Sequence, residues 1–145
     1  DGKLLCFALD RIDDVVTLSS YEYVCCPVDI DEYFDDIIGV TNYANKPVEH
    51  ILFWVSDNSK EYVRTKPIHG SQKSYSGEKD SVFRSQYPSL VGGMFFSIDC
   101  KYNYELIREL CSFGSSLLVL SPKNIQDMVY ERISGMMKEY EFLRK

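Results

Sequence analysis

The stretch Ile68–Tyr75 holds the side chains of this sequence that most resemble an active site. His69, Ser71 and Gln72 place an imidazole, a hydroxyl and an amide close together along the chain. Nucleophilic catalysis would also need a carboxylate to orient the base and donors for an oxyanion, and neither stands at a fixed spacing from this stretch. In a strand, His69 and Ser71 point to one face and Gln72 to the other. We therefore expect a structural or binding role here, and no catalytic residue.

Motifs for metal or cofactor binding are missing from the sequence. The five cysteines form no CxxC pair, and His50 and His69 are far apart. The acidic run at 29–36 lacks the Gly and the Glu of a calcium loop, and the glycines at 92–93 fit a turn or bulge better than a dinucleotide loop. We expect no metal, no cofactor, and reduced cysteines in a cytoplasmic protein.

Composition indicates a single globular unit. The chain has 145 residues, 45% of them hydrophobic, and its longest apolar runs have the length of a strand, so we expect no membrane-spanning helix. The net charge is −6, with −9 in residues 1–62 and +3 in the remainder. This balance argues against duplex DNA binding by the chain alone. The sequence opens without Met or a signal peptide, so we expect it to continue a longer chain.

The first 46 residues are predicted to form an arm. The segment LLCFALDRI at 4–12 is typical of a strand, and we interpret it as the last strand of a sheet whose other strands lie elsewhere. The segment at 28–39 predicts a helix, because Asp29 or Asp31 can cap its start and Gly39 can end it. The polar residues at 41–47 predict a linker, which separates this arm, residues 1–46, from a compact domain at 47–145.

The compact domain is predicted to alternate strands and helices. Asn58 and Asn103 stand at helix starts, and Ser121 with Pro122 opens a long last helix. This order is that of a ferredoxin-like split βαβ domain with an added C-terminal helix, and the fold class is therefore α+β. We predict strands at 49–56, 69–76, 92–102 and 115–120, helices at 58–66, 104–114 and from 122 onwards, and an extended connection at 77–91.

Five segments together resemble one known family. In chain order they are FALDRI at 7–12, DIDEYFDDIIGV at 29–40, EHILFWVS at 49–56, EYVRTKPIHGSQK at 61–73 and ELIRELCSFGSSLLVLSPKNI at 105–125. This series is similar to the C-terminal part of bacterial WYL-domain transcriptional regulators. That part comprises the end of the WYL barrel, a linker helix and the C-terminal extension called WCX.

The resemblance implies transcription regulation rather than catalysis. In this family a winged helix-turn-helix binds DNA, a barrel senses a ligand, and the extension contributes to dimerisation and to the ligand response. It implies that this chain reaches DNA only through an N-terminal domain outside the sequence. The Trp-Tyr-Leu signature is absent, so the effector is left open as a nucleic acid or a small molecule. The alternative is a small-molecule-binding or catalytic domain on the same fold.

Residues for these roles follow from the resemblance and from the last helix. Arg11 matches the Arg of the family's LDRI strand, which contacts the ligand. We expect His69 and Gln72 to fix a turn or to face the effector-binding barrel. The last helix is longer than one face of the sheet requires, and its far end carries Met136, Met137 and Tyr140. These residues are expected to form the interface of a homodimer or to pack against the N-terminal arm.

Overall fold

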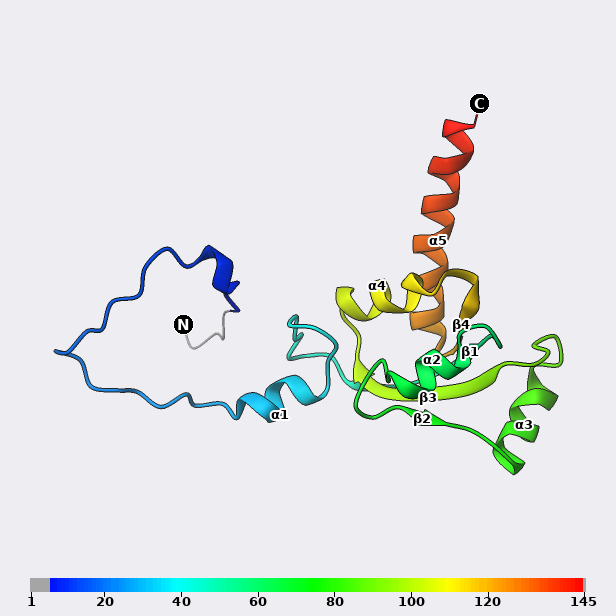
Figure 1. Cartoon of the computed structure of the whole chain (residues 1–145), viewed down its shortest axis with the longest axis horizontal. Coiled ribbons are helices and arrows are strands. Elements are labelled where there is room, and N and C mark those ends of the chain that lie inside the picture. The colour runs from blue at the N-terminus through cyan, green and yellow to red at the C-terminus, as the bar shows by residue number, and fades with distance from the viewer. Residues whose placement is uncertain (1–5, 145) are drawn as a thin grey trace.

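The computed structural model describes residues 6–144. Four strands form one antiparallel sheet in the order β2-β3-β1-β4. The helices α2 and α4 connect these strands in the ferredoxin-like split βαβ plan, which confirms the predicted α+β fold (Figure 1). The strands are β1 (Val48–Val55), β2 (Lys73–Ser74), β3 (Met94–Lys101) and β4 (Leu117–Ser121), and the two connecting helices are α2 (Lys60–Thr65) and α4 (Tyr104–Ser112).

The hydrophobic core lies on one face of this sheet. Residues alternate between the two faces along each strand, and Ile51, Phe53 and Val55 of β1 share a buried cluster with Phe96 and Ile98 of β3. Three helices cover this face, because each of them contributes to the same cluster. Their buried residues are Val63 of α2, Leu106, Ile107 and Leu110 of α4, and Ile125 and Val129 of the last helix, α5 (Lys123–Leu143).

A helix covers part of the opposite face, where the sequence predicted an extended connection. This helix, α3 (Glu78–Gln86), lies between β2 and β3 (Figure 1). Asp80 pairs with Arg84 one turn later, at 2.7 Å, and the ring centre of Phe83 lies 5.4 Å from that of Phe95 on the sheet. The prediction was wrong because the segment at 77–91 has a weak apolar pattern. Its helix is held by tertiary contacts instead, namely the packing of Phe83 and the bonds from Arg84 to the carbonyls of the two glycines before β3.

Strand β2 is also shorter than predicted. Only Lys73 and Ser74 pair with β3, whereas the sequence suggested a strand over 69–76. Residues 69–72 form a turn instead, which the amide N–H of Gln72 closes by donating to the carbonyl of His69 at 3.0 Å. The pattern of alternating residues there is too short to distinguish a strand from a turn.

The start of α2 differs from the predicted cap. The helix begins at Lys60 after Ser59, and neither Ser59 nor Asn58 supplies a side-chain cap. The carbonyl of Ser56 accepts from the amides of Ser59 and Lys60 at 3.0 and 2.9 Å, so the backbone itself satisfies the first donors.

The N-terminal arm contains one helix, α1 (Ile30–Asp35). Asp29 caps it as predicted, since its Oδ1 accepts from the amides of Asp31 and Glu32 at 3.0 and 3.2 Å. The predicted strand at 4–12 does not form over its described part, residues 6–12. Leu4 and Leu5 lie outside the described residues, and Leu9–Arg11 is a short 3-10 helix, η1. No strand of the described residues lies beside this segment, so its backbone bonds close a local turn instead.

The linker after α1 packs on the compact domain near Asn103. Thr41 Oγ1 donates to Glu105 Oε1 at 2.8 Å, and the amide of Lys101 donates to the carbonyl of Asp36 at 2.7 Å. Burial alone would raise the pKa of Glu105, but the bonds from Thr41 and from backbone amides outweigh it and hold that pKa below its usual value. The carboxylate therefore fixes the linker while it is ionised.

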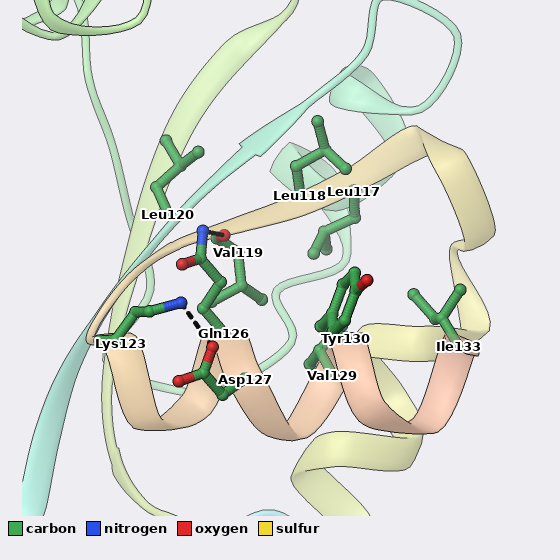
Figure 2. A pocket seen from close by; sticks show the side chains of 10 residues that line it. All are labelled: Leu117, Leu118, Val119, Leu120, Lys123, Gln126, Asp127, Val129, Tyr130 and Ile133. Atoms are coloured by element: carbon green, nitrogen blue, oxygen red, sulfur yellow. Dashed lines mark hydrogen bonds and ion pairs between the residues drawn. The ribbon is translucent and has the colours of Figure 1, made fainter. Parts of the chain in front are cut away.

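The long helix α5 begins under β4 and then leaves the sheet. Ser121 ends β4 rather than capping the helix, and Pro122 is the N-cap residue without a side-chain bond. Gln126 Nε2 donates to the carbonyl of Val119 at 3.1 Å, which ties the first turns to the edge strand (Figure 2). The distal half then extends away from the rest of the domain (Figure 1). Among residues 6–144, no helix has the length and apolar character that crossing a membrane requires.

Candidate functional site

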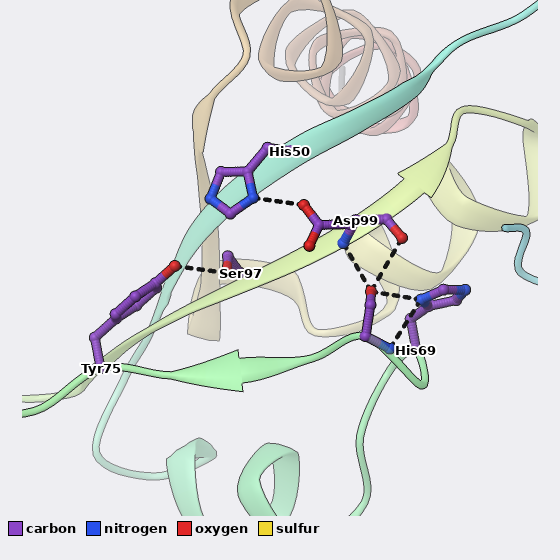
Figure 3. Close-up of polar contacts among 6 residues, drawn as sticks. His50, His69, Tyr75, Ser97 and Asp99 are labelled. Atoms are coloured by element: carbon purple, nitrogen blue, oxygen red, sulfur yellow. Dashed lines mark hydrogen bonds and ion pairs between the residues drawn. The ribbon is translucent and has the colours of Figure 1, made fainter.

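The turn that holds His69 is tied to the sheet by Ser71. The Ser71 hydroxyl accepts from the amide of Asp99 at 2.7 Å, lies 3.0 Å from the carbonyl of Asp99 and lies 2.7 Å from His69 Nδ1 (Figure 3). The amide of Ser71 also donates to Nδ1 at 3.2 Å, so the neutral imidazole carries its proton on Nε2. The hydroxyl of Ser71 is thus held by several partners, and this arrangement suits a structural clamp.

Both the oxygen and the nitrogen of the Gln72 side-chain amide form hydrogen bonds within the chain. Its Oε1 accepts from the backbone N–H of Ile68 at 3.0 Å, and its Nε2 donates to the carbonyl of Val63 at 2.8 Å. Because Val63 belongs to the last turn of α2, Gln72 joins the end of that helix to the turn before β2. The expectation that Gln72 fixes a turn agrees with these bonds.

The structure brings His69 and Gln72 together but leaves Arg11 apart. His69 lines a hollow of about 470 Å³ between the turn and the end of α1, beside Phe34 and Ile37. Arg11 is exposed in η1, within the arm that extends away from the sheet (Figure 1). The three residues named for effector binding therefore form no common site in this chain, and their role stays a prediction.

A polar pair that the sequence did not indicate lies across the two central strands of the sheet, beside this turn. His50 of β1 and Asp99 of β3 are register partners, and His50 Nδ1 lies 2.6 Å from Asp99 Oδ1 (Figure 3). Nearby, Tyr75 OH lies 2.8 Å from Ser97 Oγ. Only the register of β1 against β3 creates the first pair, and the one sequence pattern that could have indicated it is the alternation of polar with apolar residues in both strands.

The distal half of α5 carries the three residues expected at a dimer interface. Met136, Met137 and Tyr140 expose 58%, 60% and 61% of their surface. They continue the apolar stripe that is buried at Ile125 and Val129. Of the described arm residues, none forms a hydrogen bond or an ion pair with this part of α5, and the arm leaves the domain in a different direction from the distal half of α5 (Figure 1).

Two hollows flank α5 where it passes β4. One lies along the edge strand and is lined by Leu118, Leu120, Val129 and Tyr130 among others (Figure 2). The second lies between the end of α4, the start of β4 and the middle of α5. Within residues 6–144, no group of three His, Cys, Asp or Glu side chains is placed to hold a metal ion.

Comparisons with known proteins add no identification. No model of a protein family matches the chain, and no curated protein matches it.

Proposed function

We propose that this chain is the dimerisation and effector-response part of a bacterial, cytoplasmic transcriptional regulator of the WYL type. The resemblance of five segments to that family supports the proposal, and the ferredoxin-like fold is compatible with it. The observation that carries it is the apolar stripe of α5, because Ile125 and Val129 are buried in the domain and the rest of the stripe is left in water.

The stripe has the spacing of an association surface. Val129, Ile133, Met136, Tyr140 and Leu143 follow one another at intervals of four and three residues, which is the a and d pattern of a helix that packs on another helix. Val129 is buried under the sheet, whereas the following four are exposed. Exposing a row of such apolar side chains to water costs free energy unless a partner covers them.

The proposed partner is a second copy of the chain. A regulator that reads a palindromic operator needs two-fold symmetry, and a helix that meets its own copy forms a closed, self-complementary interface. DNA contact itself is assigned to a domain outside this chain, and the effector response to Arg11, His69 and Gln72 in the full-length protein.

Sedimentation equilibrium of the chain tests the proposal. We expect a dimer of the 16.8 kDa chain and its dissociation in Met137→Glu, because Met137 flanks the stripe beside Met136 and a carboxylate cannot be buried unpaired in an apolar interface. Lys138→Gln is the matched control, since it changes the net charge of the same helix by the same amount at the neighbouring position. A monomer at high protein concentration, or equal dissociation of both variants, would refute the interface.

A further inference from the structure

A cavity of about 680 Å³ lies where α4, β4 and α5 meet. This volume falls in the range of small-molecule sites, which is roughly 300–1,000 Å³. Its lining combines an apolar wall with two cations and one thiol. The residues that matter are Leu118 of β4, Ile133 and Met136 of α5, Arg108 and Cys111 of α4, and Arg132 of α5.

The apolar wall continues into a second hollow. Leu118 and Ile133 line both this cavity and the groove along β4 that Figure 2 shows. That groove adds about 470 Å³ and is lined by Leu120, Val129 and Tyr130. The two hollows together offer an elongated apolar surface, which suits a chain-like molecule better than a compact one.

The two arginines of the cavity lack acidic partners. Arg64 and Arg84 of the compact domain are paired with Glu61 and Asp80, whereas no carboxylate of the described residues forms an ion pair with Arg108 or Arg132.

The guanidinium of Arg132 donates to Tyr104 OH at 3.3 Å and lies 4.9 Å from the centre of the Tyr104 ring. This leaves most of its five donors without a partner among the described residues. A guanidinium of this kind matches the two oxygens of a carboxylate.

We propose that this cavity binds an amphipathic carboxylate, with the head group at Arg108 and Arg132 and the aliphatic chain along Leu118 and Ile133. The charge of the head group satisfies the two unpaired cations, and the chain covers the apolar wall. The proposal does not depend on the function proposed above, because Arg108, Arg132 and Leu118 lie outside the expected dimer interface and only Ile133 and Met136 belong to both surfaces.

Cys111 provides a probe inside the cavity. Burial raises the pKa of its thiol, against the opposing charge of Arg132, so we expect it to react slowly with iodoacetamide. Cys25 and Cys26 are exposed and serve as internal references. Burial, together with the charge of Asp99, raises the pKa of Cys100 to about 12, so Cys100 stays unmodified.

The test measures alkylation of each cysteine by peptide mass spectrometry, with dodecanoate below its micellar concentration as the ligand. We expect dodecanoate to slow the alkylation of Cys111 roughly fivefold or more at saturation and to leave Cys25 unchanged. Dodecan-1-ol has the same chain without the charge, and it should protect Cys111 much less. Equal protection by the alcohol, or no protection by dodecanoate, overturns the proposal.

Variants locate the head group. The double change Arg108→Gln and Arg132→Gln should weaken dodecanoate binding roughly tenfold or more in calorimetry, because both cations are lost. Lys138→Gln, which removes a cation of α5 outside the cavity, should leave it unchanged. Circular dichroism verifies that each variant is folded, and unaltered binding by a folded double variant would contradict the assignment.

A second copy of the chain is the competing occupant. It would protect Cys111 without dodecanoate, and this protection would rise with protein concentration, which would overturn the proposal. The Met137→Glu variant separates the two sites, because we expect it to bind dodecanoate with wild-type affinity whether or not the wild-type chain dimerises. Loss of dodecanoate binding in a folded Met137→Glu chain would refute a site that is independent of the dimer.

Discussion

Ser71 shows how one side chain extends a sheet beyond its last backbone pair. Strand β2 pairs with β3 only at Lys73 and Ser74, and the Ser71 hydroxyl then contacts both the N–H and the carbonyl of Asp99. The hydroxyl takes the place that a further residue of β2 would occupy in the ladder. The turn that contains His69 is therefore held against the middle of the domain by a side chain rather than by regular pairing.

Replacing this hydroxyl should weaken the domain measurably. Ser71→Ala removes two contacts to the β3 backbone and leaves the backbone amide and carbonyl of Asp99 without their partner. We therefore expect the free energy of unfolding to fall by about 1–2 kcal/mol. Urea unfolding followed by circular dichroism measures the difference. Ser74→Ala is the matched control, because Ser74 is exposed and its side chain forms no hydrogen bond within residues 6–144. Equal effects of the two changes would show that the hydroxyl of Ser71 is not a clamp.

At the scale of elements, α4 and the linker are joined through Asn103. Its Oδ1 accepts from the amide of Leu106 at 2.8 Å, and this is the cap that the sequence predicted. Its Nδ2 donates to the carbonyls of Ile38 and Thr41 at 2.8 and 2.9 Å. One buried amide thus starts a helix and holds the segment that leads from α1 to β1.

Two substitutions separate these roles. Asn103→Ala should lower the unfolding free energy by about 2–4 kcal/mol, because it removes the cap and leaves two carbonyls without donors. Asn103→Asp keeps the cap oxygen but places a buried carboxylate oxygen against the carbonyls of Ile38 and Thr41, so we expect at least as large a loss of stability at neutral pH together with faster chymotryptic cleavage after Tyr43. Urea unfolding and limited proteolysis measure the two effects. Cleavage at the wild-type rate in the Asp variant would argue against the linker contact.

The elements differ in how far the sequence could predict them. Strands β1, β3 and β4 and helices α1 and α4 were predicted because each has a continuous apolar pattern or a capping residue of its own. Helix α3 was missed, since its packing depends on a contact between Phe83 and Phe95 of a strand that follows it. The predicted start of α2 was wrong, because the backbone carbonyl of Ser56, and not the side chain of Asn58, accepts hydrogen bonds from the first amides of the helix.

At the scale of the whole molecule, charge is distributed unevenly. The first 62 residues carry a net charge of −9, and the rest carry +3. The acidic residues include the first turn of α1, where Asp31 and Glu32 favour the helix start. The acidic arm therefore repels the phosphates of DNA, and the compact domain attracts these phosphates only weakly.

The chain by itself should therefore not bind duplex DNA specifically. We expect fluorescence anisotropy to detect at most weak binding at low salt, with no difference between two duplexes of unrelated sequence, and its loss at physiological salt. A preference for one duplex that survives physiological salt would contradict this prediction. It would also remove the proposal that DNA contact belongs to a domain outside this chain.

The sequence by itself determined most regular elements of the compact domain and their order, because apolar spacing and capping residues act locally, but it did not indicate α3 or the short extent of β2. It also determined that His69 and Gln72 lie close together, since they are only three residues apart in the chain. The tertiary structure alone decided which distant groups meet. The pairing of His50 with Asp99 depends on the register of two strands. The meeting of Arg108, Arg132 and Leu118 around one cavity depends on how α4 and α5 pack beside β4, and such a contact leaves no pattern in any one segment.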